Sequence, residues 1–372
     1  MWFATCPACT CPRYCPTIIA LLALLYARSL YQDRYKLRSF PIVATTFFPI
    51  PNLQFNTTLK QQQKNQNKIA IITGANSGVG FASTKMFTNN GVHVVMACRS
   101  MNKCLTAQKQ LDMKGKSTCL TIDLASLHSV RQFAIDFGKR FSRLDILMLN
   151  GGIIAPHEII QPYNIEKTFL VNYLSHFLLT RLLLPLLSAP NNTDARIVTV
   201  TSDAHAYSYK TGILSIKEMN DPTKTNTAQN YAQAKLANIM HIRELTYQLE
   251  DTAKKTNTTS NIFCNAAHPG LVATKLFHNT FLRYGLSEKT SSLLQYWFEH
   301  VLTTLNLVFD VDRGALTQVY LSLSEDVVVL GYRGLFFVPI AGVAPMDDFI
   351  NNRTLTKSLY DMSMELTKEY VV

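Results

Sequence analysis

Short apolar runs alternate with longer, helically spaced segments from residue 68 to the end of the chain. The runs are rich in β-branched residues and contain few polar positions, a pattern typical of strands buried on both faces of a sheet. The segments between them have helical spacing, most clearly from Ile165 to Leu187. Seven strands are predicted: Ile69–Thr73, Val92–Cys98, Thr118–Ile122, Leu144–Leu149, Arg196–Thr201, Asn261–Asn265 and Leu335–Val338. This alternation predicts an α/β fold, a doubly wound parallel sheet of about seven strands flanked by helices.

The first 67 residues follow a different pattern. Thr17–Ala27 is an uncharged apolar run, shorter than the ~20 residues that a helix needs to span a bilayer. A second apolar run, Phe40–Ile50, follows a basic linker, and two short apolar segments around a basic patch favour a shallow or hairpin membrane anchor. We therefore expect residues 1–67 to be a membrane-associated extension and residues 68–372 to be the folded domain. A cleaved or organellar targeting peptide and a disordered start are the alternatives.

The positive charge is concentrated in that extension. Residues 1–67 carry +6 of the formal net charge of +11, which leaves the folded domain only mildly basic. No nucleic-acid partner is expected, because the domain also lacks a recognisable nucleic-acid-binding motif. More positive charge follows Thr17–Ala27 than precedes it, which predicts a domain facing the cytosol from the endoplasmic reticulum or another organelle membrane. Glycan at any of the sequons would contradict this orientation; they are Asn56, Asn191, Asn257 and Asn352.

The eight cysteines fall into two groups. Four lie within ten residues of each other in "CPACTCPRYC", at Cys6, Cys9, Cys11 and Cys15. Four ligands so close together leave little chain to wrap a zinc ion, so no metal site is predicted, and lipidation or an unstructured tail are the open alternatives. The others are scattered along the predicted domain and are expected to be reduced; they are Cys98, Cys104, Cys119 and Cys264.

Three glycines follow the first predicted strand directly. Gly74, Gly78 and Gly80 lie in "TGANSGVG", and a helical pattern runs from Phe81 to Phe87. Glycines between a strand and a helix allow a sharp turn and the close approach of a ligand, while the helix N-terminus offers unpaired N–H groups to a phosphate. The stretch therefore predicts a dinucleotide-binding turn.

The residue after the second strand bears on which dinucleotide is bound. An acidic residue at this position would bind the ribose hydroxyls of NAD, but "VHVVMAC" is followed by Arg99. A guanidinium is suited to a 2′-phosphate, so the sequence favours NADP over NAD.

A tyrosine and a lysine in "NYAQAKLANI" provide candidate acid–base chemistry. Tyr231 and Lys235 are four residues apart, so on a helix they share one face. A free tyrosine has a pKa near ~10, and a nearby ammonium would lower that pKa into a working range. The same spacing recurs at Tyr163 and Lys167, which we interpret as an ordinary surface pair. Only Tyr231 follows a buried strand that ends in a hydroxyl residue, Ser202.

These motifs, taken in order, resemble a known enzyme family. "TGANSGVG", "ACR", "DLAS", "LNGGI", "VTSDAH", "YAQAK" and "HPGLVAT" occur in the order seen in the short-chain dehydrogenase/reductases. The resemblance covers about residues 66 to 350 and is strongest to the branch of retinol dehydrogenases and WW-domain-containing oxidoreductases, although no WW domain is present. "DLASLHSVRQF" and "HFLLTRLLL" are also similar to light-dependent protochlorophyllide reductases, which stay an alternative. The implied fold is Rossmann-type.

The resemblance implies roles for individual catalytic residues. Tyr231 would be the general acid/base, Lys235 would bind the nicotinamide ribose, and Ser202 would polarise the substrate carbonyl. Asn172 would hold the water of a proton relay. In a plainer interpretation Ser202 is one more strand-end hydroxyl and Asn172 only bridges within a long helix.

It likewise implies a cofactor site for NADP(H). The glycine turn would hold the pyrophosphate, and Arg99, aided by Asn76 or Ser77, would meet the 2′-phosphate. Asp123 would bind the adenine, unless it only caps the helix starting near Leu124. The implied cofactor contacts are Thr73, Gly74, Asn76, Ser77, Gly78, Val79, Gly80, Arg99, Asp123, Leu124, Asn150, Gly151, Tyr231, Lys235, Pro269, Gly270 and Thr274.

The sequence departs from the family pattern at three points. Gly151 stands where alanine is usual, which should loosen that turn, and Thr201 replaces the first serine of a common pair. The 29 residues from Ser202 to Tyr231 form a longer gap than in compact members.

The substrate is indicated only indirectly. Phe277–Phe309, where the family has its substrate loop, is rich in leucine and aromatic residues. An apolar lid beside a membrane anchor favours a lipophilic carbonyl or alcohol: a retinoid, a sterol or a long-chain aldehyde. The alternatives are that the segment is a packed helix or the face of a homodimer. An NADP-binding regulatory or scaffold protein without turnover also stays open, because fold alone does not establish function.

Overall fold

A computed structural model describes the folded part of the chain. It covers residues 65–111, 116–190, 192–209, 212–272, 287–297, 300, 303 and 308–371. The expected N-terminal anchor with its cysteine cluster, Thr274 and most of Phe277–Phe309 lie outside these residues, so those expectations stay predictions.

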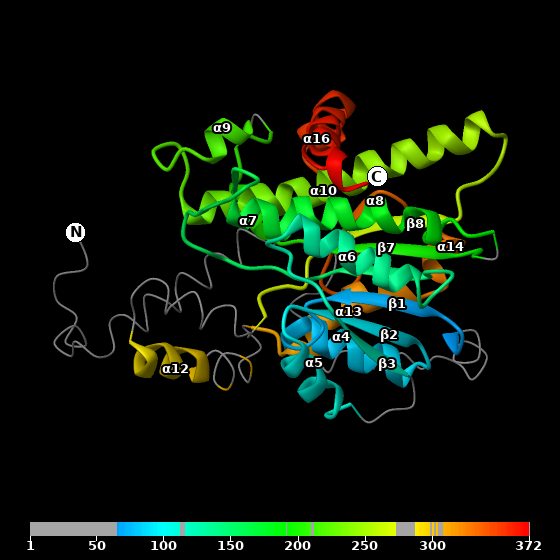
Figure 1. The fold of residues 1–372 in the computed structure, drawn as a ribbon, viewed down its shortest axis with the longest axis horizontal. Coiled ribbons are helices and arrows are strands. Elements are labelled where there is room, and N and C mark those ends of the chain that lie inside the picture. The colour runs from blue at the N-terminus through cyan, green and yellow to red at the C-terminus, as the bar shows by residue number, and fades with distance from the viewer. Residues whose placement is uncertain are drawn as a thin grey trace, which may run out of the picture. The chain divides into compact units, whose positions relative to one another are not determined.

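A single large sheet forms the centre of the fold (Figure 1). Its strands are β1 (Ile69–Thr73), β2 (His93–Cys98), β3 (Ser117–Thr121), β4 (Ile146–Leu149), β7 (Ala195–Val200), β8 (Ile262–Ala267), β9 (Leu335–Val338) and β10 (Gly342–Ala344). The order is β10-β9-β8-β7-β4-β1-β2-β3, and all pairs are parallel except β10 with β9. The predicted α/β fold is confirmed, with an eighth strand added. Sequence reasoning missed β10 because it is three residues long, begins with Gly342 and exposes 47% of Val343.

The strand order reverses beside β1. Ile71 of β1 pairs with Val95 of β2 on one side and with Leu147 of β4 on the other. The chain leaves β1 toward β2 and β3, then returns to build the other half of the sheet from β4. In doubly wound sheets the carboxyl ends of strands at such a reversal open a crevice that binds ligands. The ends of β1 and β4 are therefore where a nucleotide site is expected.

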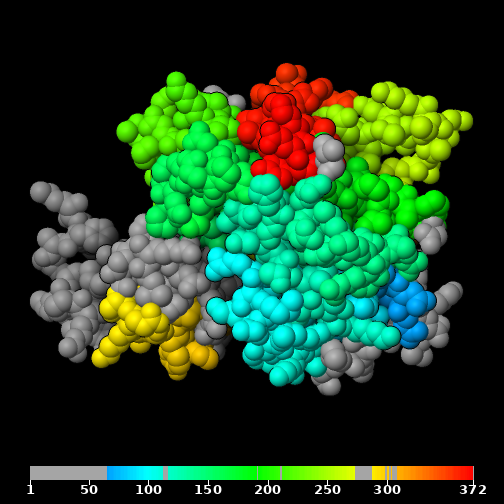
Figure 2. All heavy atoms as spheres, in the orientation of Figure 1, coloured from blue at the N-terminus to red at the C-terminus, as the bar shows by residue number. Residues whose placement is uncertain are grey.

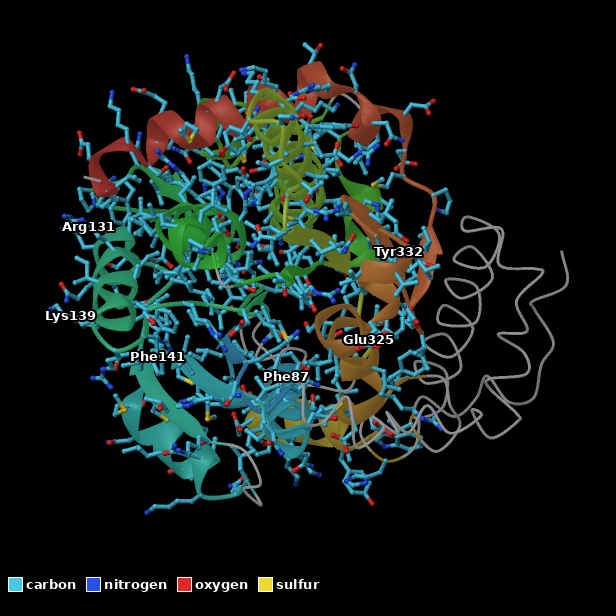
Figure 3. The ribbon with its side chains drawn as sticks, turned by 90° about the vertical axis from the view of Figure 1, so that its right-hand side faces the viewer. Phe87, Arg131, Lys139, Phe141, Glu325 and Tyr332 are labelled. Atoms are coloured by element: carbon cyan, nitrogen blue, oxygen red, sulfur yellow. A yellow bond between two sulfur atoms is a disulfide. The ribbon has the colours of Figure 1, made fainter. Side chains whose placement is uncertain are left out.

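Helices cover both faces of the sheet. The long helices around it are α4 (Gly78–Asn89), α5 (Met101–Gln108), α6 (Leu127–Gly138), α8 (Ser175–Leu187), α10 (Thr227–Lys255), α13 (Val311–Leu323) and α16 (Arg353–Leu366). A further helix, α12 (Glu288–Tyr296), belongs to the segment between β8 and α13. Helices α4 and α13 pack against each other, as do α6 and α8. Phe87 of α4 is fully buried, whereas Figure 3 shows Arg131 of α6 and Lys139, which follows that helix, at the outer edge of the molecule.

The short elements connect this frame. They are β5 (Ile159–Ile160), β6 (Ile165–Glu166), α7 (Lys167–Phe169), the π-helix η3 (Leu170–Leu174), the 3-10 helix η4 (Asp203–Tyr207), α9 (Ile216–Met219), α14 (Asp326–Val329), α15 (Asp348–Asn351) and the 3-10 helix η6 (Lys368–Tyr370).

The predicted helix Ile165–Leu187 differs in detail from the prediction. Its first two residues form β6, and the rest runs through α7, the π-helical turn η3 and α8. The run Lys167–Leu187 is long and apolar enough to cross a membrane by length and composition, but 72% of its apolar window is buried inside the protein. It is the core helix that carries Asn172.

The C-terminal helix α16 closes over two elements of the candidate site. Figure 2 shows it at the top of the molecule beside α10. Thr356 donates a hydrogen bond to Glu244 of α10 over 2.9 Å, and the Ser363 hydroxyl lies 2.7 Å from the Tyr173 hydroxyl in η3. The C-terminus therefore fixes the helices that bear Lys235 and Asn172.

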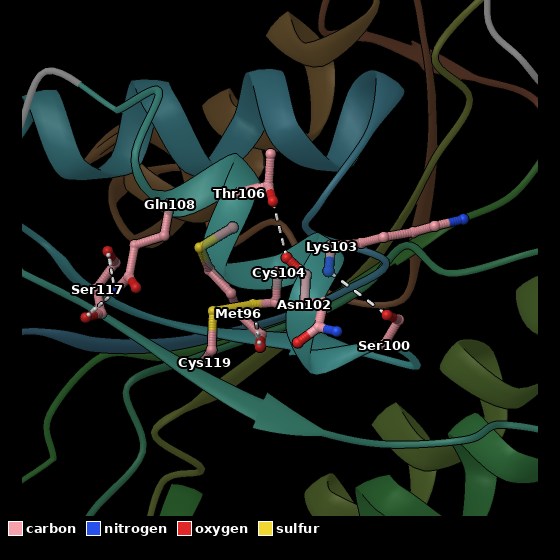
Figure 4. The surroundings of a disulfide bond; sticks show 9 residues. All are labelled: Met96, Ser100, Asn102, Lys103, Cys104, Thr106, Gln108, Ser117 and Cys119. Atoms are coloured by element: carbon pink, nitrogen blue, oxygen red, sulfur yellow. Dashed lines mark hydrogen bonds between the residues drawn. A yellow bond between two sulfur atoms is a disulfide. The ribbon is translucent and has the colours of Figure 1, made fainter.

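The expectation that all four domain cysteines are reduced was wrong for two of them. Cys104 of α5 and Cys119 of β3 form a disulfide across a sequence separation of 15 (Figure 4). Both side chains are buried, because α5 packs against β3. Their spacing carried no signal, since only the crossover from β2 to β3 brings them together. Cys98 and Cys264 are free and buried.

Removing this disulfide should destabilise the domain. Replacing both cysteines with serine is expected to lower the free energy of unfolding by about 3 kcal/mol, the chain-entropy value for a loop of this length. Guanidinium unfolding measures the loss, and the wild-type protein in reductant should show a similar one. Non-reducing peptide mapping that finds Cys104 and Cys119 as free thiols would contradict the bond.

Candidate active site

The glycine turn follows β1 at the reversal of the sheet. Gly74 and Gly78 have φ angles of 68° and 54°, in the left-handed region that favours glycine. The Gly74 N–H donates to the carbonyl of Ala97 in β2 over 2.9 Å. Helix α4 begins at Gly78, earlier than the pattern predicted, and its N-cap, Ser77, makes no side-chain capping bond. The N–H groups of the first turn are thus open toward an anion.

Gly80 is required by close packing of α4 on β1. A Cβ atom on Gly80 would lie 2.5 Å from Nδ2 of Asn150 and closer still to the carbonyl oxygen of Gly74. Both neighbours are held by other bonds, so neither can move aside cheaply. The position accepts only glycine without a shift of the turn.

The Thr73 hydroxyl joins the ends of β1 and β4. It accepts hydrogen bonds from the backbone N–H groups of Asn150, at 2.9 Å, and Gly151, at 2.8 Å. The Asn150 side chain donates in return to the Thr73 carbonyl over 2.9 Å. A Cβ on Gly151 would lie 2.9 Å from the Leu124 side chain, so glycine at this position allows Leu124 to pack against the turn.

The expected adenosine contacts lie at neighbouring strand ends. The exposed Arg99 directly follows β2, and Asn76 and Ser77 lie in the glycine turn. Asp123 accepts from the backbone N–H of Ala125 over 2.9 Å. The alternative that Asp123 caps the next helix was wrong, because α6 begins at Leu127 and Ser126 caps it.

Asn172 lies in η3 and bridges to the segment after β4. Its side-chain oxygen accepts from the N–H of Ile153 and its amide donates to the Ile153 carbonyl, each over 2.8 Å. A Cβ on Gly152 would lie 3.3 Å from the Asn172 side chain and 3.6 Å from Nζ of Lys235. Asn172 and Lys235 therefore flank the same glycine. π-Helical turns of this kind are frequent at functional sites.

Ser202, Tyr231 and Lys235 come together between β7 and α10. Lys235 is 4% exposed, and its ammonium donates to the Val200 carbonyl over 3.0 Å and lies 5.5 Å from the centre of the Tyr231 ring. Burial lowers the pKa of Lys235 to about 8. Burial also raises the pKa of Tyr231 to about 12, and a hydrogen bond from Ser202 offsets part of that rise. The sequence-based expectation of a lowered tyrosine pKa is thus not met: Tyr231 holds its proton at neutral pH.

Two of the expected nicotinamide contacts lie at the end of β8. Gly270, which follows Pro269, has a φ of 85°, and a Cβ there would lie 2.7 Å from the Phe309 ring. Both features require glycine. Thr274 lies outside the described residues.

The second Tyr-x-x-x-Lys pair has a structural role. The Tyr163 hydroxyl accepts the N–H of Leu127 at the start of α6 over 3.0 Å, and Lys167 pairs with Glu158 at 2.6 Å. Among the described contacts, neither Tyr163 nor Lys167 touches Ser202, Tyr231 or Lys235.

Sequence reasoning missed His176. This histidine of α8 is 2% exposed and connects Thr73 to Asn172. The available signal was its place in "NYLSH", four residues after Asn172 on the same helical face.

Thr201 keeps a hydroxyl where the family has serine, and it uses that hydroxyl. The side chain is buried and donates to the carbonyl of Lys235 over 2.7 Å. Thr201→Val should therefore lower the free energy of unfolding by about 1 kcal/mol, the net value of one such bond, while Thr201→Ser should cost less. Chemical denaturation compares the two variants, and equal losses would contradict a role for the hydroxyl.

The turn between β1 and α4 fits the phosphates of a dinucleotide. The start of α4 has no side-chain cap and no acidic residue in its first turn. Gly74 and Gly78 have left-handed φ angles, and Gly80 leaves no room for a side chain. In the described part of the chain, no group of three or more His, Cys, Asp or Glu side chains is placed to hold a metal ion. Fold and site together define a dinucleotide-binding protein of the Rossmann type with a Ser–Tyr–Lys group beside the nucleotide turn.

Comparison with known proteins agrees with this class. The family model for short chain dehydrogenase matches residues 68–284. Short-chain dehydrogenase TIC 32 B, chloroplastic, of Brassica napus is 31% identical over 304 residues, covering 80% of this chain and 88% of that protein. Retinol dehydrogenase 13 of Homo sapiens is 32% identical over 285 residues, covering 75% and 78%, and the WW domain-containing oxidoreductase of Gallus gallus is 31% identical over 311 residues, covering 81% and 68%.

Solved structures share the fold. A putative uncharacterized protein from Mycobacterium Paratuberculosis has a TM-score of 0.58 and 26% identity, covering 81% of this chain and 94% of that one. A short chain dehydrogenase from Shigella flexneri complexed with NADP has a TM-score of 0.53 at 15% identity, covering 74% and 98%. The chain belongs to the short-chain dehydrogenase/reductase family, whose members are oxidoreductases that bind a nicotinamide cofactor.

Proposed function

We propose that this protein is an NADP(H)-dependent oxidoreductase that interconverts a carbonyl and an alcohol on a lipophilic substrate, with Tyr231 as the general acid/base. The observation that carries the proposal is the convergence of Ser202, Tyr231 and Lys235, with Lys235 beside Gly152 in the segment that follows β4. When bound, the cofactor supplies the hydride, and the protein supplies orientation and the proton.

The protonation of Tyr231 favours the reductive direction. Its pKa of about 12 means that the phenol carries a proton at neutral pH and can donate it to a carbonyl oxygen. Ser202 lies within hydrogen-bonding reach of the Tyr231 hydroxyl, and its single O–H can turn from that bond to donate to the same carbonyl oxygen. Oxidation would first require the loss of the phenol proton, which burial opposes.

Lys235 and Asn172 complete the proposed proton path. The buried Lys235 ammonium is directed toward the end of β7 and can hold the nicotinamide ribose hydroxyls. We assign Asn172 to the relay through its main-chain carbonyl, because Ile153 engages both polar atoms of its side chain.

Arg99 supports NADP over NAD. It is exposed at the carboxyl end of β2, the same strand whose Ala97 carbonyl accepts the N–H of Gly74 in the glycine turn. Arg99→Ala should weaken NADPH binding by roughly 10- to 100-fold, since a charge-assisted contact is worth about 1.5–3 kcal/mol, and should leave NADH binding unchanged. Lys103→Ala is the control, an exposed cation on the neighbouring turn of α5. Equal losses for both cofactors, or none, would contradict the assignment.

The lipophilic substrate rests on two observations. Helix α12, in the segment where the family has its substrate loop, leaves Leu293, Tyr296 and Trp297 exposed. Several related proteins are named retinol dehydrogenases. NADPH oxidation by the full chain should be measured with all-trans-retinal, a medium-chain aldehyde and a ketosteroid, with NADH in parallel. We expect turnover that requires NADPH and is fastest with a lipophilic carbonyl; NADPH binding without turnover on this panel would support a regulatory or scaffold protein instead.

Membrane association and a cytosol-facing domain stay part of the proposal. They depend on residues 1–64, outside the described ones, and the relatives named chloroplastic introduce a plastid as another organelle. The Cys104–Cys119 disulfide is an argument against the cytosolic orientation, because stable disulfides are rare in a reducing cytosol. Unmodified Asn257 and Asn352 would support the cytosolic face, and glycan on either would place the domain in the secretory lumen.

A further inference from the structure

His176 lies between the nucleotide turn and the π-helical turn of Asn172. Its Nε2 atom is 3.0 Å from the Thr73 hydroxyl, and its Nδ1 atom is 3.2 Å from the main-chain carbonyl of Asn172. The ring is buried and makes these two contacts with opposite edges. It therefore connects β1 to η3.

The direction of every hydrogen bond in this chain is determined. A carbonyl oxygen only accepts, so Nδ1 of His176 carries the hydrogen and donates to Asn172. In a neutral imidazole Nε2 is then an acceptor, and the Thr73 hydroxyl must donate to it. Thr73 can do so because its oxygen already accepts the N–H groups of Asn150 and Gly151. These groups thus form one directed chain that runs from the Asn150 and Gly151 N–H groups after β4, through Thr73 and His176, to the Asn172 carbonyl in η3.

The chain requires an uncharged imidazole. Burial, and next the charge of Lys235, lower the pKa of His176 to about 3. A protonated ring could no longer accept a hydrogen bond from Thr73. It would also repel the Lys235 ammonium, which lies beside Gly152, as the Asn172 side chain does. The ring is therefore neutral throughout the physiological range.

We propose that His176 is a positioning residue that couples the nucleotide turn to the catalytic segment: it orients the Thr73 hydroxyl through Nε2 and the Asn172 carbonyl through Nδ1. This inference rests on the proposed function for its kinetic consequences. It assigns an effect on cofactor affinity to Nε2, which contacts Thr73, and an effect on the proton relay to Nδ1, which contacts Asn172.

Two substitutions separate the two contacts. In His176→Asn the amide nitrogen takes the place of Nδ1 and can still donate to the Asn172 carbonyl, but nothing reaches Thr73. In His176→Gln the amide oxygen takes the place of Nε2 and can still accept from Thr73, but the donor to Asn172 is lost. Each variant keeps one half of the chain.

The expected result is a crossed pattern. His176→Asn should raise the Kd for NADPH by about tenfold and change kcat at saturating NADPH by less than threefold, as one lost hydrogen bond implies. His176→Gln should do the reverse. His241→Asn and His241→Gln are the matched controls, because His241 is equally buried, also has its pKa lowered to about 3, and contacts only the aromatic rings of Tyr173, Phe177 and Tyr360 in described ring contacts. Parallel changes in Kd and kcat for both His176 variants, or the same changes in the His241 variants, would overturn the proposal.

A second measurement does not depend on activity. In a double-mutant cycle for unfolding, Thr73→Val and His176→Asn should be strongly non-additive, because both remove the same bond. Additive losses would overturn the inference even if the enzyme works as proposed. If the two unfolding free energies are non-additive but the protein neither binds NADPH nor reduces carbonyls, the hydrogen-bond chain is supported and the proposed function is rejected.

Discussion

Tyr231→Phe should lower kcat for carbonyl reduction by roughly 10³-fold and change NADPH affinity by less than about twofold. The substitution removes only the hydroxyl, which is hydrogen-bonded to Ser202 and holds the proton that reduction requires. The ring, and its position 5.5 Å from the Lys235 ammonium, would remain. Single-turnover kinetics with saturating NADPH measures the loss, and cofactor fluorescence measures binding.

The second tyrosine of the same sequence pattern provides the control. Tyr163→Phe removes the acceptor for the Leu127 N–H and should lower the free energy of unfolding by about 1 kcal/mol without changing kcat. If Tyr163→Phe slowed reduction as much as Tyr231→Phe, or if Tyr231→Phe kept more than about a tenth of the rate, Tyr231 would not be the general acid.

Gly80→Ala should weaken NADPH binding by at least about 100-fold, about 2.8 kcal/mol of binding energy. The added Cβ would lie 2.5 Å from Asn150 and still closer to the Gly74 carbonyl, so the turn must move. Cofactor titration measures the effect directly. Part of the cost will also appear as lower stability, because α4 must separate from β1.

Gly138→Ala is the matched substitution. Gly138 is the last residue of α6, and a Cβ there meets nothing within 4 Å. It should stabilise the protein by about 0.5–1 kcal/mol and leave NADPH binding unchanged, because alanine loses less backbone entropy than glycine in a helix. Normal NADPH affinity in Gly80→Ala would contradict the close packing that defines the turn.

The sheet could be predicted because its strands are buried on both faces and appear as unbroken apolar runs. The glycine turn and the Tyr231–Lys235 pair could be predicted for a similar reason: each depends on spacing within one short segment. The strand β10 and the π-helical turn η3 could not, since neither has a pattern distinct from a loop or an α-helix.

The contacts that the sequence did not reveal are those between distant segments. The Cys104–Cys119 disulfide depends on how α5 packs against β3, and the chain through Thr73 and His176 joins residues 103 positions apart. The raised pKa of Tyr231 could not be predicted either, because burial raises it, the hydrogen bond from Ser202 lowers it, and only the folded structure shows that burial dominates.

Hydride transfer itself tests the central claim most directly. The full chain should be incubated with NADPH deuterated at the transferable C4 position and with all-trans-retinal, and the product alcohol analysed by mass spectrometry. We predict one deuterium at the former carbonyl carbon with the wild-type protein, and none with Tyr231→Phe in the same time. If NADPH binds but no deuterium reaches this or any other lipophilic carbonyl, the protein is not the reductase proposed here.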